Sequence, residues 1–216
     1  MSTFVDFFFP RRCLICNRVL ASGEKDLCLN CIEVIKYQGD AFDRYQDKLT
    51  NRKIENIDVF LSYSYCKRAL WDFKYRGNIH KGRWLGSLWA KHLRECPWLK
   101  DIDYIVPIPL HWRRRVWRGF NQSEILAEVI SKDLGIKMRC SDIKRIKHNK
   151  PQIKAKHRQL NVKGVFSLRN SEALKGKHIL LIDDVITSSA TSYEAIEAIK
   201  NIDGLKISLA FLTSHS

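Results

Sequence analysis

The segment HILLID, at residues 178–183, constrains the fold of this chain more than any other stretch. A strand with one face in water alternates apolar and polar residues, whereas this segment has no polar face. It therefore predicts a central parallel strand that is covered on both sides. Strand-like and helix-like patterns alternate before and after it, and this order indicates an open, mostly parallel α/β sheet.

Periodicity places the other elements of this sheet. Alternating or uniformly apolar residues predict strands at 61–65, 103–109 and 206–212. Apolar residues at helical spacing predict helices at 83–93, 121–134 and 193–200. Asn121 and Glu124 have the spacing of a capping box, and Gly135 ends the apolar stripe of the same helix.

Two C-x2-C pairs near the start of the chain predict a separate small module. Eleven residues lie between the pairs, and a single metal ion can be held by all four thiolates: Cys13, Cys16, Cys28 and Cys31. Such a closed site is structural, and we expect Zn²⁺ because so short a segment has little core without metal. A pair of redox sites or a chance spacing are the alternatives. We predict a module with its linker at 1–45, followed by a larger domain at 46–216.

The other three cysteines have no partner of this kind nearby. Cys66, Cys96 and Cys140 are predicted to be buried and to pack as small apolar side chains.

The two aspartates after the buried strand predict a binding site. In an open α/β sheet, ligands bind at the carboxyl ends of the strands, where Asp183 and Asp184 fall. The following hydroxyl residues begin a helix, whose free backbone N–H groups and dipole favour a phosphate. Carboxylates repel phosphate, so they suit the hydroxyls of a sugar or a Mg²⁺ ion. The alternative, ordinary turn and capping chemistry, is weakened by the buried strand and the length of the hydroxyl run.

This segment resembles the phosphoribosyl pyrophosphate (PRPP) signature of type I phosphoribosyltransferases. Two further stretches, at 106–127 and 150–166, resemble the ComF family, in which a four-cysteine zinc module precedes such a domain. The RGFNQ segment at 118–122 and the spacing of Gln152, Arg158 and Asn161 are distinctive of that family. The resemblance covers essentially the whole chain.

The resemblance assigns roles residue by residue. It implies that the catalytic pair Asp183 and Asp184 contacts the ribose hydroxyls. It implies that the 5′-phosphate is wrapped by a loop of Thr187, Ser188, Ser189, Ala190 and Thr191. It also implies that a loop near the pyrophosphate and its Mg²⁺ carries Arg113, Arg114, Arg115 and Arg118. Ser189 stands where the family has glycine, so the phosphate turn loses some conformational freedom, and turnover is expected to be weaker than binding.

The charge of the chain leaves a second class of function open. Its formal net charge is +15, and residues 111–169 hold sixteen Lys and Arg against four acids. A transferase would displace pyrophosphate at C1 of the ribose with an acceptor nitrogen that the sequence does not identify. The resemblance to the ComF family implies a role in DNA uptake or competence. The alternative to a transferase is a non-catalytic PRPP-sensing or single-stranded-DNA-binding adaptor, whose partners would include DNA-processing proteins. A third alternative is an interaction module with a decayed pocket.

The tryptophans among these arginines allow two interpretations. Trp112 suits base stacking and internal packing equally, whereas packing is favoured for Trp117.

The sequence also bears on location. No apolar window is long enough to span a bilayer, and the first residues lack the layout of a secretory signal. We therefore expect a cytoplasmic protein without membrane insertion.

Overall fold

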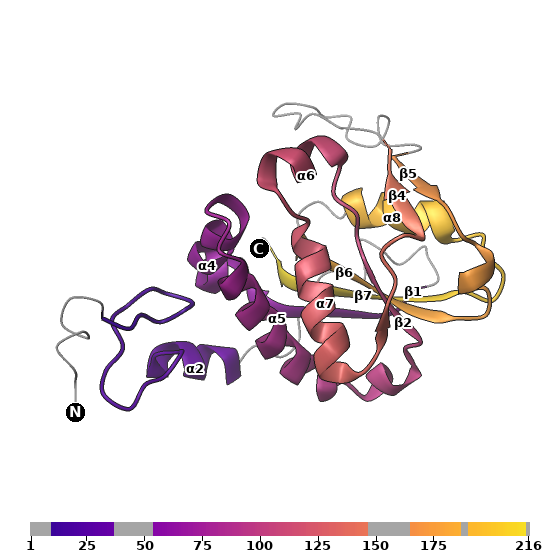
Figure 1. Cartoon of the computed structure of the whole chain (residues 1–216). Coiled ribbons are helices and arrows are strands. Elements are labelled where there is room, and N and C mark those ends of the chain that lie inside the picture. The colour runs from indigo at the N-terminus through magenta and orange to yellow at the C-terminus, as the bar shows by residue number, and fades with distance from the viewer. Residues whose placement is uncertain (1–9, 37–53, 147–164, 187–189, 215–216) are drawn as a thin grey trace, which may run out of the picture.

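The computed structural model describes residues 10–36, 54–146, 165–186 and 190–214. The predicted boundary at 45/46 lies outside these residues. The amino-terminal module ends with one helix, α2 (Leu29–Lys36). In Figure 1 this module lies to one side of the larger domain, next to α5 (Ile79–Arg94).

The larger domain is built on a five-stranded sheet in the order β1-β7-β6-β2-β3, with every neighbouring pair parallel. The predicted α/β class is confirmed. The strands of this sheet are β1 (Ile54–Ser62), β2 (Tyr104–Pro107), β3 (Lys137–Met138), β6 (His178–Ile186) and β7 (Lys206–Ser214). A separate antiparallel pair is formed by β4 (Ile143–Arg145) and β5 (Phe166–Leu168).

Helices cover both faces of the sheet (Figure 1). Side chains of β6 alternate between two hydrophobic clusters. Ile179 and Leu181 pack with α8 (Ala190–Ile199) and the β4–β5 pair, whereas Leu180 and Ile182 pack against the other layer of helices. That layer comprises α4 (Tyr63–Tyr75), α5 and α7 (Gln122–Leu134). β6 is therefore the central, doubly covered strand that its composition predicted.

The remaining described helices are short. They are α6 (Trp112–Arg118) and the 3₁₀ turns η1 (Pro97–Asp101) and η2 (Glu172–Leu174).

The strand predicted at 61–65 is wrong beyond its second residue. β1 ends at Ser62, and α4 begins at Tyr63. The alternation covers only five residues, whereas buried side chains then recur at helical spacing, at Cys66, Ala69, Leu70 and Phe73. The longer helical period decides the conformation because it buries one face against the sheet.

Helices α4 and α5 pack closely through a glycine. A methyl group at Gly82 would overlap the ring of Phe73. Phe73 in turn stacks on Phe120, with ring centroids 5.4 Å apart. The close packing of α4 on α5 therefore depends on this small residue.

Candidate functional site

The four predicted metal ligands lie together in the amino-terminal module. The sulfur atoms of Cys13, Cys16, Cys28 and Cys31 all lie within 4.8 Å of one another. Cys16 Sγ and Cys28 Sγ are 3.7 Å apart, and sulfurs bound tetrahedrally to one zinc ion at about 2.3 Å lie about 3.8 Å apart. The donor set and its spacing therefore fit Zn²⁺ with no open position.

The backbone prepares one of these thiols for metal. Burial opposes ionisation of Cys13, but backbone hydrogen bonds at Cys16, Cys28 and Ile15 outweigh it and lower the pKa of this thiol to about 7. A thiolate is the form that binds metal, so the backbone favours this form at Cys13. Burial raises the pKa of the Cys16 and Cys31 thiols, and a bound cation would favour their ionisation.

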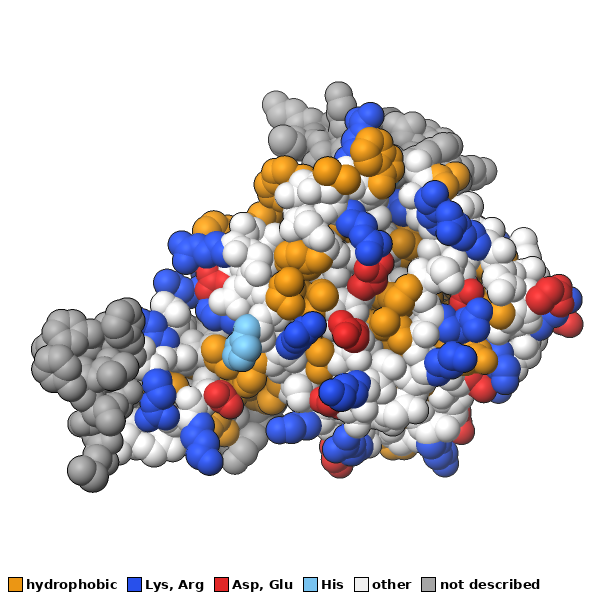
Figure 2. All heavy atoms as spheres, in the orientation of Figure 1, with side chains coloured by type: hydrophobic (Ala, Val, Ile, Leu, Met, Phe, Trp, Pro, Cys, Tyr) orange, Lys and Arg blue, Asp and Glu red, His pale blue; other side chains and the backbone are white. Residues whose placement is uncertain are grey.

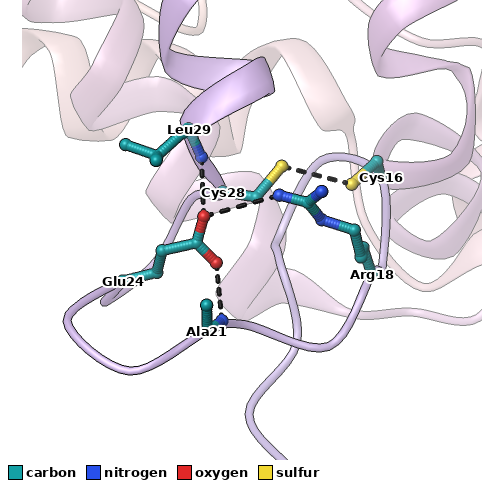
Figure 3. A network of polar contacts seen from close by, with 6 residues as sticks. All are labelled: Cys16, Arg18, Ala21, Glu24, Cys28 and Leu29. Atoms are coloured by element: carbon teal, nitrogen blue, oxygen red, sulfur yellow. Dashed lines mark hydrogen bonds and ion pairs between the residues drawn. The ribbon is translucent and has the colours of Figure 1, made fainter.

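Glu24 supports the loop between the two cysteine pairs (Figure 3). Its carboxylate accepts hydrogen bonds from the backbone N–H of Ala21 at 2.6 Å and of Leu29 at 2.8 Å, and Arg18 lies 3.4 Å away. These interactions hold the pKa of Glu24 below its usual value. The carboxylate thus joins both ends of the loop that precedes α2.

The module contacts the larger domain through α5. Trp84 packs in the small cluster of Cys13, Ile15 and Cys28, and also in the domain cluster on the α4–α5 side of the sheet. Ile35 of α2 belongs to the same two clusters.

Asp183 and Asp184 lie within the last part of β6, which extends to Ile186, rather than after the strand as HILLID alone suggested. Both side chains contact the helix layer formed by α4, α5 and α7. Asp183 accepts a hydrogen bond from Ser123 Oγ at 2.8 Å, and Asp184 forms an ion pair with Lys74 Nζ at 2.8 Å. Three elements, β6, α7 and α4, therefore meet at this pair.

The first of these carboxyl groups is hard to ionise. Burial, and then the charge of Asp184, raise the pKa of Asp183 to about 7, against the opposing hydrogen bond from Ser123. An added cation would relieve this repulsion, because it favours the charged form.

Half-buried arginines surround the aspartates. Arg118 interacts electrostatically with Asp184, and Arg145 with Asp183, while burial lowers the pKa of both guanidinium groups. The Nε atoms of Arg118 and Arg145 are buried and have no hydrogen-bond partner among the described residues. Arg114 adds a further positive charge near both arginines.

The predicted arginine loop is a helix, α6. The imidazole of His111 begins it by accepting a hydrogen bond from Arg113 N, and Gly119 ends it in the left-handed conformation at φ 85°. The helix divides the four predicted arginines. Arg115 is held by Glu124 at 3.1 Å and Arg113 is exposed, whereas Arg118 interacts with Asp184 and Arg114 lies near Arg118.

Most of the predicted phosphate loop lies outside the described residues. This applies to Thr187, Ser188 and Ser189. Ala190 is the first residue of α8, and Thr191 follows in its first turn. The helix start therefore follows the aspartates closely, as the prediction required.

The RGFNQ segment connects α6 to α7. Asn121 caps α7 by accepting a hydrogen bond from Ser123 N, and its amide also donates to the carbonyl of Ile108. The predicted cap is thus confirmed, although Glu124 contacts Arg115 instead. This arrangement places Ser123 where its hydroxyl reaches Asp183.

Sequence reasoning did not single out Lys74, Ser123 or Arg145. Ser123 adjoins the RGFNQ segment, which was the available signal. Lys74 lies in the last turn of α4, and Arg145 is one of many cations in a basic stretch, so neither has a local pattern that marks it.

A second surface lies beside the aspartates, on α4 and α6. Four side chains expose between 48% and 71% of their area: Trp71, Tyr75, Trp112 and Trp117. The expected internal packing of Trp117 is therefore wrong. Trp71 and Trp117 flank Tyr75 with ring centroids 6.1 and 6.2 Å from it.

Guanidinium groups cover several of these rings. Arg76 lies over Trp71 at 4.8 Å, Arg118 over Tyr75 at 5.3 Å, and Arg113 over Trp112 at 5.3 Å. Figure 2 shows apolar and basic side chains close together over α4 and α6. We call this surface the aromatic–arginine face: Trp71, Tyr75, Arg76, Trp112, Arg113 and Trp117.

The three single cysteines differ in environment. Cys66 is fully buried, as predicted, whereas Cys96 is half-buried and Cys140 is exposed. Of the described helices, none combines the length and apolarity that crossing a bilayer requires.

Comparison with known proteins finds a matching family model and several proteins of similar sequence. The family model of the phosphoribosyl transferase domain matches residues 121–216. Competence protein F of Haemophilus influenzae is 28% identical over 213 residues, which cover 90% of this chain and 93% of that protein. Competence protein ComFC of Bacillus subtilis is 30% identical over 153 residues, 70% of this chain and 60% of that protein.

Other matches are partial. The DNA utilization protein YhgH of Escherichia coli is 35% identical over 106 residues, 48% of this chain and 45% of that protein. Among solved structures, adenine phosphoribosyltransferase from Leishmania tarentolae is 13% identical with a TM-score of 0.40, over 62% of this chain and 71% of that one.

Proposed function

The chain belongs to the ComF family, and on that premise we propose that its larger domain binds phosphoribosyl pyrophosphate with Mg²⁺ at the carboxyl end of β6. Asp183 and Asp184 would contact the ribose hydroxyls and the metal. A loop from Thr187 to Thr191 would hold the 5′-phosphate, and Arg114 and Arg118 the diphosphate. The domain boundary is proposed at 45/46.

The observation that carries this proposal is the charge pattern at β6. Two carboxylates lie near Lys74, Arg118 and Arg145, and both of these guanidinium groups have a buried Nε with no hydrogen-bond partner among the described residues. A ligand with a hydroxyl or cationic part and a strongly anionic part satisfies both sets of groups. Arginine suits the anionic part because its planar group binds two oxygens at once.

Ligand entry requires an exchange at Asp184. Its partner in the described structure is Lys74, so the ligand must replace this ammonium group. Lys74 then becomes available to a phosphate oxygen. Bound Mg²⁺ would neutralise the leaving diphosphate when the C1–oxygen bond of the ribose breaks and an acceptor nitrogen takes its place. Ser123 would keep Asp183 in position throughout.

A thermal-shift titration with PRPP and Mg²⁺ tests the binding site. At about 100 times Kd, the ligand should stabilise the native chain by about 2.7 kcal/mol. Asp184→Asn should lose the shift, and Asp203→Asn, which changes an exposed acid elsewhere, should keep it. A native chain without a shift would overturn the proposal.

Pyrophosphate release separates an enzyme from a protein that only senses the ligand. Release that depends on an added acceptor and on Asp184 would identify a phosphoribosyltransferase. Binding without release from a panel of nitrogen acceptors would favour the sensing role.

The aromatic–arginine face favours a second candidate function, contact with single-stranded DNA. Exposed rings offer stacking surfaces to bases, and the arginines beside them attract phosphates. The relatives named for competence and DNA utilization agree with a role in DNA uptake. Arg118 links this face to the aspartates, because it lies over Tyr75 and interacts with Asp184.

Fluorescence anisotropy with a labelled oligothymidylate tests this second function. Affinity should fall steeply with salt, and Trp117→Ala should weaken it, whereas Tyr193→Ala on α8 should not. PRPP should compete with the oligonucleotide because both use Arg118. Equal loss in the two variants would count against stacking on this face.

The module is proposed to hold Zn²⁺ as a structural ion. Its four sulfurs, which lie within 4.8 Å of one another, would occupy all four positions of a tetrahedral zinc ion and leave none for a catalytic water.

A further inference from the structure

A second group of metal-ligand side chains lies in the larger domain, apart from the four cysteines. Asp58 comes from β1, His92 from the last turn of α5, and Cys96 from the segment between α5 and η1. One ligand atom from each lies within 4.8 Å of the other two. All three side chains are half-buried, so an ion could reach them from solvent.

A neighbouring tryptophan orients this group. Trp89 Nε1 donates a hydrogen bond to Asp58 Oδ2 at 3.2 Å, which directs the other carboxylate oxygen, Oδ1, to His92 Nε2 at 2.7 Å. The ring of Phe60 packs against the imidazole with centroids 4.9 Å apart. Ligand side chains in metal sites are commonly held by such outer contacts.

From this geometry we propose that Asp58, His92 and Cys96 bind a divalent transition-metal ion, with Zn²⁺ as the best fit. Imidazole nitrogen, carboxylate oxygen and thiolate sulfur are the three donor types that zinc accepts. The half-exposed position leaves room for water as the fourth ligand. On binding, Cys96 loses its thiol proton to solvent. Neutral His92 releases the Nε2 proton that it donates to Asp58 and takes one up from solvent on Nδ1, which frees Nε2 for the metal.

The surrounding charge favours a cation here. Asp58 and the exposed Glu95 place two acids beside the thiol of Cys96. A simple hydrogen-bonded pair of Asp58 and His92 would not need this thiol and would bind no ion.

The ion would join parts of the domain that are distant in sequence. β1 is an edge strand of the sheet, and α5 is the helix that contacts the module through Trp84. A metal bridge would fix the carboxyl end of α5 to β1 while the module packs on its other half.

Metal content of the full chain tests the site. After loading with Zn²⁺ and removal of free ion, native mass spectrometry should count two ions per chain. Cys96→Ser should hold one, and Cys28→Ser should lose the other. Cys140→Ser is the matched control, because this thiol is exposed and outside both clusters, and it should hold two.

A measurement on the native chain tests the proposal even if the substituted chains do not fold. Loading with ¹¹³Cd should give two NMR resonances, since an all-sulfur site and a site with one sulfur shield the nucleus differently. One resonance in the native chain, or a Cys96→Ser variant that still holds two zinc ions, would overturn the proposal.

Discussion

The amino-terminal module and the larger domain solve the problem of stability in different ways. Described residues of the module bury Cys13, Ile15, Cys28 and little other apolar material. The domain has two extensive hydrophobic clusters, one on each face of its sheet. From this difference we expect the same chain to depend on a bound metal in one region and on side-chain packing in the other.

Removing zinc should produce the largest difference in stability between the module and the domain. Structural zinc sites contribute roughly 10–16 kcal/mol to the folding of small peptides, so a chelator or Cys28→Ser should unfold the module. The domain should keep its own cooperative transition, because none of the four cysteines belongs to its two hydrophobic clusters. Trp84 and Ile35 pack in a cluster of each region. Limited proteolysis measures whether residues 10–36 become susceptible to cleavage, and calorimetry measures whether the unfolding transition of the domain remains. Simultaneous loss of both regions would contradict the comparison.

Asp183→Asn should stabilise the domain, because the native carboxylate costs it stability. The pKa of this acid is raised from 3.8 to about 7, so the folded state holds a proton that the unfolded chain has lost. Native stability therefore falls as pH rises from about 4 to 7, and the variant should gain up to about 4 kcal/mol at pH 8. Urea unfolding at pH 4 and pH 8 measures the gain, which should disappear at pH 4.

The same substitution should weaken binding of Mg²⁺ and PRPP. A variant that is more stable at pH 8 yet binds the ligand normally would show that Asp183 is not part of the site. For the native chain, Mg²⁺ binding should strengthen as pH rises through about 7, because the carboxylate then ionises.

Gly82→Ala should destabilise the domain and leave the module intact. The added methyl group overlaps the ring of Phe73, and forced overpacking costs roughly 1–3 kcal/mol. Gly86→Ala is the matched control in the same helix, where the new atom meets Val129 at 3.1 Å and a smaller loss is expected. Urea unfolding of both variants measures which of them loses more stability. The zinc content should not change in either variant.

Glu24→Gln should give the smallest effect, confined to the module. The amide keeps one acceptor oxygen but loses the second bond to the loop, so zinc affinity should fall roughly tenfold. Competition with a colorimetric chelator measures it. An altered unfolding midpoint of the domain would show that the stabilities of the two regions are coupled.

Patterns within one element were predictable from sequence. The doubly covered β6 follows from its lack of a polar face, and the metal cluster follows from the spacing of Cys13, Cys16, Cys28 and Cys31. Both depend on residues that are close together in the chain. The same holds for Asn121 as the cap of α7.

Features that depend on the meeting of distant elements were not predictable. Lys74 reaches Asp184 only because α4 lies beside β6, more than a hundred residues later in the chain. Asp58, His92 and Cys96 likewise meet through the packing of α5 on β1. The helix α6 was missed because a seven-residue segment rich in arginine has no apolar period to reveal it.

Trp84 has a practical consequence for anyone who dissects this protein. The indole of Trp84 packs against both regions. Truncating the chain at residue 45 would therefore remove the module but leave its contact surface on the larger domain. A chain trimmed there would expose Trp84 and part of Leu88 to water, and copies of it should adhere to one another through this patch. Replacing Trp84 by a polar residue in the trimmed chain should restore its solubility.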